Sequence, residues 1–227
     1  DGESPEILIG DMNKLRTLSQ KPDKPYFMLG HSMGSYLLRR YLSVYGGGLS
    51  GAVIMGTGAN PDAVAKLGMA VCKAIAAFKG WKYRSPFMEK LFFSGDFQKF
   101  DMDGTHPENS WLTKDTEIVR FYYSEPRCTF KFTLKAYYDF LKTVYYVNRK
   151  ENVEKIPKDL PILMVAGDCD PVGEFGKAVK RVYEMYKAAG INDVTLKLYE
   201  NDRHEILNET DKERVFDDIF NWCEGRL

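Results

Sequence analysis

The sequence has no excess of either charge. Its 227 residues include 32 Lys and Arg against 32 Asp and Glu, so the formal net charge is zero. This balance gives no overall field that would favour nucleic acid. The lysines near Lys131, Lys135 and Lys142 are interpreted as a solvated helix face. We therefore expect no nucleic-acid partner.

Long apolar runs and closely spaced cysteines are also missing. No stretch approaches the roughly 20 residues that cross a bilayer, so no transmembrane segment is expected. The four cysteines, Cys72, Cys128, Cys169 and Cys223, lie far apart and form no C-x-x-C pair. This spacing favours free thiols in a reducing compartment over a disulfide framework. The cysteines thus predict a cytoplasmic protein, on the condition that no targeting segment precedes Asp1.

Apolar runs of strand length are present. Hydrophobic residues make up 44% of the chain and charged residues 28%, as in an ordinary globular protein. Short apolar runs predict strands at residues 26–29, 49–55, 161–166 and 194–199. Helical spacing follows most of them, with helices expected at 174–189 and from a capping box at 210–213 onward. The alternation predicts a mostly parallel sheet flanked by helices.

About a hundred residues interrupt this alternation, and their periodicity is helical. Helices are expected from the Asn60-Pro61 cap to Gly80 and at residues 85–100, 114–123 and 133–148. We therefore predict a core part at 1–58, a helical lid insertion at 59–157 and a second core part at 158–227.

Aromatic residues are concentrated in this insertion. Eighteen of the 31 lie between Trp81 and Tyr146. Most are expected to form the insertion's own core, and a minority to line an apolar substrate pocket. The candidates for the pocket are Phe92, Phe93, Tyr122 and Tyr138.

The stretch Gly30-His31-Ser32-Met33-Gly34 is the clearest chemical motif. It has the form G-x-S-x-G and lies between a predicted strand and a predicted helix. In such an elbow the serine occupies a strained turn, both glycines avoid side-chain collisions, and the helix N-terminus faces developing negative charge. Ser32 is therefore a candidate nucleophile, and the alternative is a Gly-rich turn with an incidental serine. The Met33 backbone N–H is a candidate oxyanion donor.

A nucleophilic serine needs a base, and the chain has only three histidines. His31 adjoins Ser32 along the chain and is expected to point away from it and to pack structurally. His106 lies in a turn of the insertion and is expected to be a surface residue. His204 follows the strand at 194–199, at the sheet edge where ligand sites of open α/β sheets collect. His204 is therefore the candidate base.

Two carboxylates compete as the acid that orients this base. Asp168 beside Gly167 and Asp170 before Pro171 could each order the turn that contains them. Asp170 lies further into the loop and can turn back toward the sheet, so it is preferred. The chain order Ser32, Asp170, His204 is the order found in α/β-hydrolases.

These motifs resemble the α/β-hydrolases of the monoacylglycerol lipase and lysophospholipase type, often labelled serine aminopeptidase-like. The resemblance rests on residues 30–34, the acid loop 167–173 and the ending Arg203–Glu209, and it covers nearly the whole chain. It implies an α/β-hydrolase fold with an inserted helical lid, and the same Ser32, Asp170 and His204 as triad.

The implied reaction is hydrolysis of a small-molecule carboxylic ester with an apolar acyl group, through an acyl-enzyme. Neither a cofactor nor a metal is expected. Two alternatives remain: a non-catalytic small-molecule-binding protein of the same fold, or an amidase, aminopeptidase or acyltransferase that uses the same triad.

One family feature has no counterpart. Such hydrolases carry an early His-Gly turn that supplies the second oxyanion donor, and no such pair precedes Asp1-Gly2. With about four strands visible, we expect a further N-terminal segment of roughly 80 to 100 residues to complete the sheet beside the strand at 26–30.

Overall fold

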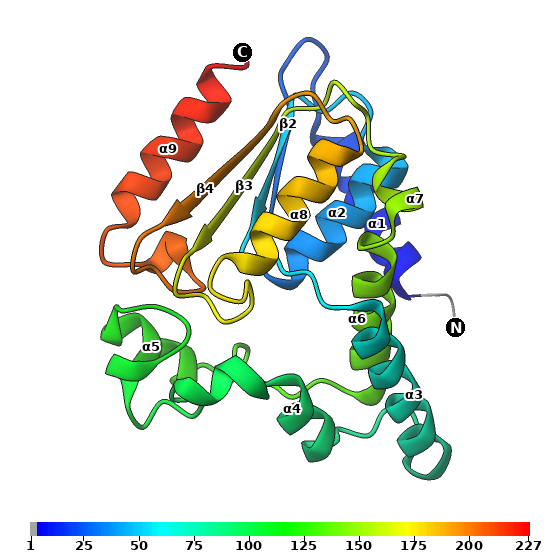
Figure 1. Cartoon of the computed structure of the whole chain (residues 1–227), viewed down its shortest axis with the longest axis vertical. Coiled ribbons are helices and arrows are strands. Elements are labelled where there is room, and N and C mark those ends of the chain that lie inside the picture. Colours follow the sequence, from blue (N-terminus) through cyan, green and yellow to red (C-terminus); the bar gives the residue numbers. More distant parts are fainter. Residues whose placement is uncertain (1–3) are drawn as a thin grey trace.

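The structure is a computed structural model that describes residues 4–227. Four parallel strands lie at its centre, in the order β1-β2-β3-β4 (Figure 1). Their bounds are Phe27–His31 for β1, Gly51–Met55 for β2, Ile162–Gly167 for β3 and Val194–Tyr199 for β4. The predicted parallel sheet is confirmed, so the carboxyl ends of all four strands share one edge.

Helices account for most of the remaining regular structure. In chain order they are α1 Ser4–Ser19, α2 Met33–Tyr45, α3 Asp62–Lys79, α4 Pro86–Phe92, α5 Thr116–Ser124, α6 Leu134–Val147, α7 Lys150–Val153, α8 Lys177–Ala188 and α9 Lys212–Glu224. Three short 3-10 turns, η1 Gly95–Lys99, η2 Pro107–Asn109 and η3 Ile206–Asn208, complete the set. None of these helices, over residues 4–227, has the length and apolar character that a membrane crossing requires.

Both faces of the sheet are covered. Helices α2 and α8 pack on one face with α1 beside them, and α9 packs on the other (Figure 1). The α2–α8 side buries Leu38, Leu42, Val179, Val182 and Tyr186 against alternate strand residues such as Ile54, Ile162 and Met164. The α9 side buries Val215 and Trp222 against Val53, Leu163 and Val165. Because successive side chains of a strand point to opposite faces, each buried strand contributes to both layers.

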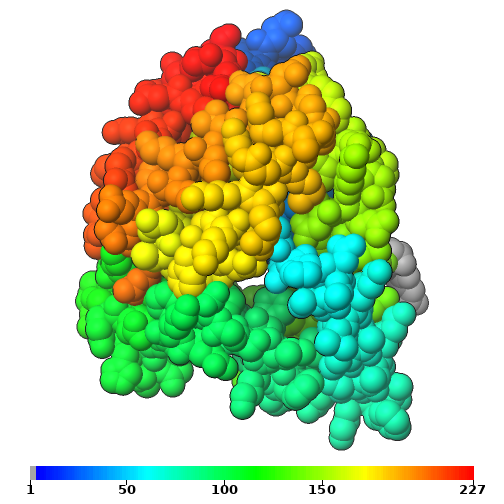
Figure 2. Space-filling view, in the orientation of Figure 1, coloured from blue at the N-terminus to red at the C-terminus, as the bar shows by residue number. Residues whose placement is uncertain are grey.

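The regular structure between β2 and β3 is helical apart from one isolated bridge, Asp101–Ser110, with irregular chain between the helices. This part lies beyond the carboxyl ends of the strands (Figure 1). Helices α3 and α6 pack closely, and Gly68 leaves room for the Leu141 side chain. In Figure 2 the green surface of the insertion lies against the yellow and orange surface of the core, with a hollow between them near the centre.

Two predicted helix boundaries were wrong, and one predicted cap differs. The helix expected at 85–100 stops at Phe92, because Gly95 has a positive φ of 68° and starts a separate 3-10 turn. The helix expected from Glu174 begins at Lys177, because Glu174, Phe175 and Gly176 all have positive φ. The helix expected at the capping box 210–213 does begin there, at Lys212, but its N-cap is Asp211 instead of Thr210, and the Asp211 side chain makes no cap hydrogen bond.

Candidate active site

Ser32 occupies the turn between β1 and α2 and has a strained backbone. Its φ of 53° and ψ of −123° are unusual for a residue with a side chain; such conformations cost about 1–3 kcal/mol each and cluster at functional sites. Hydrogen bonds hold the turn in place: Ser32 N donates to Met55 O at 3.1 Å, and Ser35 N donates to Ser32 O at 2.8 Å. The turn is the elbow geometry that the motif predicted.

The two glycines of the motif differ in their surroundings. A Cβ at Gly30 would lie 2.4 Å from Gly34 O and 2.9 Å from Leu38 Cβ. A Cβ at Gly34 would have no neighbour within 4 Å. The expectation that both glycines avoid collisions is therefore wrong for Gly34. The close approach of β1 and α2 requires a glycine at position 30 alone.

His204 and Asp170 form a buried pair. His204 Nδ1 lies 2.9 Å from Asp170 Oδ2, and the two side chains are 2% and 0% exposed. The second Asp170 oxygen accepts a hydrogen bond from Val172 N at 2.8 Å. Because a carboxylate can only accept, Nδ1 must carry the hydrogen. His204 Nε2 has no hydrogen-bond partner among the described residues, which leaves its lone pair available to take a proton.

Ser32 and His204 lie at the same edge of the sheet. Ser32 N donates to Met55 O, at the end of β2. Gly56 follows Met55 in the chain, and a Cβ at Gly56 would lie 3.1 Å from His204 Cε1. Gly56 has a positive φ of 57° and leaves room for the imidazole. The close approach of the β2 end to His204 therefore depends on a glycine.

The competing aspartate has a different role. Asp168 Oδ1 accepts a hydrogen bond from Asn201 N at 2.8 Å and so orders the loop before His204. The structure brings Asp170, and not Asp168, to the imidazole. This is the arrangement for which Asp170 was preferred.

The other two histidines lie where the sequence predicted. His31 Nε2 donates to His204 O at 3.0 Å, and the two ring centroids are 4.7 Å apart. Burial, with the neighbouring His204, lowers the pKa of His31 to about 4. His31 is therefore neutral at physiological pH and supports the turn that carries His204. His106 is 72% exposed beside Glu108.

Sequence reasoning missed Trp111, which lies against His204. The ring centroids are 5.0 Å apart with an interplanar angle of 30°. The backbones also pair: His204 N donates to Trp111 O at 3.3 Å, and Glu205 N donates to Leu112 O at 2.7 Å. Aromatic content marked the insertion as a whole, but no local pattern distinguishes Trp111 from its neighbours.

A cavity of about 480 Å³ opens beside the start of α2. Most of its lining is apolar and includes Met33, Leu37, Phe132 and Phe140, with Lys135 and other charged side chains among the remainder.

None of the four predicted pocket residues lines this cavity. Phe92 and Tyr138 pack against the insertion's own core, and Tyr122 contacts Tyr123. Phe93 approaches the site indirectly, with its ring centroid 6.1 Å from that of Trp111. A substrate contact by these four residues stays a prediction.

Residues 3–211 match the model of the serine aminopeptidase S33 family, also described as Hydrolase_4. The chain belongs to this family. Its fold is the α/β-hydrolase fold, as predicted.

Several proteins to which the chain is similar are esterases or lipases. A monoacylglycerol lipase of Mycolicibacterium smegmatis is 26% identical over 210 residues, which are 91% of this chain and 64% of that protein. A thermostable carboxyl esterase from Bacillus coagulans superposes with a TM-score of 0.84 at 30% identity, covering 96% of this chain and 70% of that one.

A monoglyceride lipase from Saccharomyces cerevisiae shares the fold with a TM-score of 0.71 at 21% identity. It is matched over 97% of this chain and 68% of its own length. The protein is thus an esterase- or lipase-like α/β-hydrolase by similarity, and it spans somewhat less than two thirds of the curated relative.

Proposed function

We propose that the protein is a serine hydrolase that cleaves small carboxylic esters with apolar acyl groups, of the monoacylglycerol or lysophospholipid type. The observation that carries this proposal is the buried Asp170–His204 pair with Nε2 unpartnered, at the sheet edge where the strained Ser32 turn also lies. The likeness to esterases and lipases supports the same reaction class.

The triad would act in two halves. In the first, Ser32 Oγ attacks the ester carbonyl while His204 Nε2 takes the serine proton, and Asp170 stabilises the resulting imidazolium. The proton then passes to the leaving alcohol, which departs as the acyl-enzyme forms. In the second half His204 removes a proton from water as the water oxygen attacks the acyl-enzyme carbonyl. The His204 imidazolium then gives that proton to Ser32 Oγ, and the C–O bond to Ser32 breaks to release the acid.

The start of α2 would stabilise the oxyanion. Met33 is the first residue of α2, and the first N–H groups of a helix have no acceptor within it. Its N–H would therefore donate to the negative oxygen of the tetrahedral intermediate. The apolar side chains of Met33 and Leu37 also line the neighbouring cavity, which suits an acyl chain better than a charged group.

Covalent labelling tests the nucleophile. A fluorophosphonate should label the full-length protein at Ser32, and Ser32→Ala should abolish labelling without changing the fold measured by circular dichroism. Labelling that persists in Ser32→Ala would refute this nucleophile, and a folded protein that never reacts would favour the non-catalytic binding protein.

A substrate panel tests the class. Esters of graded acyl length, with anilides of the same acyl groups beside them, should show faster ester turnover that increases from short to medium acyl chains. Faster anilide turnover would replace the ester assignment with an amidase.

The acid is tested by a matched pair of substitutions. Asp170→Asn should lower kcat by roughly three to four orders of magnitude, because the amide no longer fixes the imidazole tautomer. Asp168→Asn keeps an oxygen for Asn201 N and should change kcat by less than about threefold. A large loss from Asp168→Asn with little from Asp170→Asn would reverse the assignment. Steady-state kinetics on one ester distinguishes the two outcomes.

A further inference from the structure

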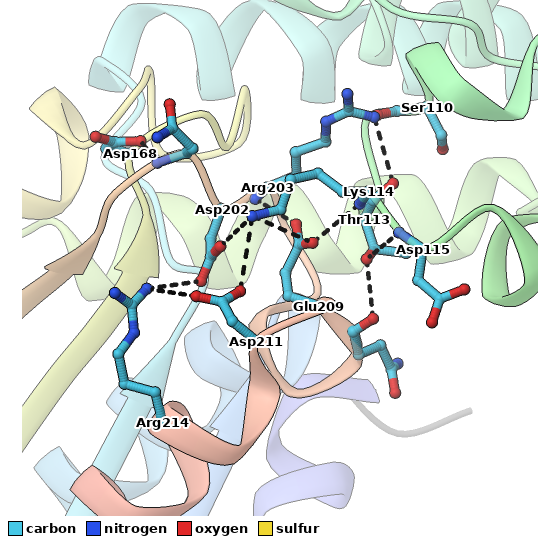
Figure 3. Close-up of polar contacts among 12 residues, drawn as sticks. Ser110, Thr113, Lys114, Asp115, Asp168, Asp202, Arg203, Glu209, Asp211 and Arg214 are labelled. Carbon is cyan, nitrogen blue, oxygen red and sulfur yellow. Dashed lines mark hydrogen bonds and ion pairs between the residues drawn. The ribbon is translucent and has the colours of Figure 1, made fainter.

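A buried polar cluster connects the turn that carries His204 to residues 108–115 of the insertion (Figure 3). We call it the histidine clamp and define it as Thr113, Lys114, Asp202, Arg203 and Glu209. Figure 3 shows these side chains converging from the insertion and from the loop between β4 and α9. None of them belongs to the proposed triad.

Glu209 is the centre of the clamp. Its side chain is fully buried. Oε1 accepts a hydrogen bond from Arg203 N at 2.8 Å, and Oε2 accepts one from Lys114 N at 3.0 Å. One carboxylate therefore binds the backbone next to His204 and the backbone of the insertion. Both partners are N–H donors, so each needs an acceptor atom. A carboxylate offers two acceptor oxygens, whereas the side-chain amide of a glutamine at this position would offer one.

Lys114 compensates the charge of the buried Asp202 and Glu209 and of the more exposed Asp211. Its Nζ lies 2.7 Å from Asp202 Oδ1, 3.8 Å from Glu209 Oε2 and 3.6 Å from Asp211 Oδ1. Partial burial favours the neutral amine, but the hydrogen bond to Asp202 and the surrounding carboxylates outweigh it and raise the pKa of Lys114. The ammonium therefore stays charged, which makes the buried negative charges tolerable.

Further bonds cross the same junction. Thr113 Oγ1 donates to Asn208 O at 2.9 Å. The Arg203 guanidinium donates to the carbonyl oxygens of Glu108, Ser110 and Thr113. Together with the pairing of Trp111 and Leu112 to His204 and Glu205, these bonds fix the backbone on both sides of the imidazole.

We propose that Glu209 is a positioning residue for His204, acting through the Arg203 backbone to hold the histidine turn on residues 108–115 of the insertion. The inference rests on the proposed function, since it concerns the base of that triad. The placement of the bonds supports it: Glu209 binds the residue immediately before His204, and the insertion backbone that it binds follows the Trp111 and Leu112 contacts to the same turn. In this proposal the insertion holds the turn of the catalytic base in place, in addition to covering the substrate.

The test is Glu209→Gln, with two quantities read from fluorophosphonate labelling: the fraction of protein that reacts and the rate constant of that fraction. The amide keeps the size of the side chain but turns an NH₂ toward one of the two N–H donors. We expect the labelled fraction to equal that of wild type and the rate constant to fall roughly 10- to 100-fold, the scale of small misplacements of reacting groups. With an ester substrate, kcat should fall similarly while KM stays within about twofold. Glu213→Gln, an exposed carboxylate on α9, is the matched control and should behave as wild type.

The opposite results overturn the proposal. A smaller labelled fraction that reacts at the wild-type rate would mean that Glu209 supports folding alone, and an unchanged rate constant in a fully folded variant would mean that it does not position His204. If Glu209→Gln does not fold, Thr113→Val decides, because it removes the bond to Asn208 O across the junction, together with the bond from Asp115 N, from a buried side chain of nearly the same shape. It should slow labelling about three- to tenfold at full labelled fraction, and a wild-type rate would overturn the proposal. Failure of the wild type to label at all would instead refute the proposed function.

Discussion

His31 places a second imidazole beside the base of the proposed triad. The two histidines contact each other, yet their hydrogen-bond partners differ: His204 binds the Asp170 carboxylate, and His31 donates to the backbone oxygen of His204. Burial of the His31 ring and the neighbouring His204 keep His31 neutral and outweigh its hydrogen bond to His204 O, which favours the charged form. The two imidazoles therefore have different proposed roles: His204 acts as the base, and His31 supports the turn that carries it.

This separation predicts a pH-dependent stability. The pKa of His31 is about 4 in the folded protein and 6.5 for an unburied histidine. Between these values the unfolded chain binds a proton that the folded chain does not, so the contribution is complete above pH 6.5 and is lost as the pH falls to 4. The full difference corresponds to about 3 kcal/mol of unfolding free energy.

Urea denaturation at pH 7 and at pH 4.5 measures this contribution. Wild type should lose more unfolding free energy between the two pH values than His31→Gln, because glutamine does not titrate. Equal losses in the two proteins would contradict the assignment of a depressed pKa to His31.

Several site residues could be predicted from the sequence because few residues in the chain have the side chains that a catalytic triad needs. With three histidines and two aspartates at one strand end, few combinations could form a triad, and the contact between Asp170 and His204 is the expected one. Trp111 and Glu209 could not be predicted, since their position beside the turn that carries His204 depends on a contact between the insertion and a loop far along the chain. Neither residue type nor local spacing encodes that contact.

At the level of helices and strands, the pattern predicted which elements exist better than where they end. Apolar periodicity located all four strands. The errors occurred where backbone conformation, and not side-chain pattern, ends an element, as at Glu174 and Phe175, which adopt positive φ without being glycine. Tertiary contacts hold these residues in conformations that their own preferences disfavour.

The contact between β1 and α2 predicts opposite effects for the two glycines of the motif. Gly30→Ala places a methyl group against Gly34 O and Leu38, so α2 must move, and we expect a loss of about 2 kcal/mol or more in unfolding free energy. Gly34→Ala meets no neighbour and lies in the first turn of α2, so it should be neutral or stabilising by up to about 1 kcal/mol. Chemical denaturation of both variants checks this, and equal effects would contradict the geometry.

The 227-residue chain by itself combines zero net charge with an exposed apolar margin made of Leu29 on β1 and of Leu15 and Leu18 on α1. Among the described strands β1 pairs with β2 alone, and Leu29 on it is 48% exposed. Helix α1 adds Leu15 and Leu18, at 66% and 83% exposure. Strand edges and apolar patches both favour association between chains, and a net charge near zero does not oppose it.

This margin predicts concentration-dependent association of the 227-residue chain near pH 7. Leu29→Lys should lower the apparent mass at a given concentration, because it places a charge on the strand edge. Phe220→Lys, on α9 and 63% exposed, is the control for adding a lysine elsewhere and should have a smaller effect. Light scattering over a concentration series measures both, and equal effects of the two substitutions would argue against β1 as the contact.

The histidine clamp also limits how this scaffold could be re-engineered. Exchanging the whole insertion for that of another hydrolase is an attractive way to graft a new substrate preference, since the two core parts would remain untouched. Here such a chimaera would also remove residues 108–115, which provide the partners of Arg203, His204 and Glu209. A workable transplant would keep that stretch from the host and draw only the surrounding helices from the donor.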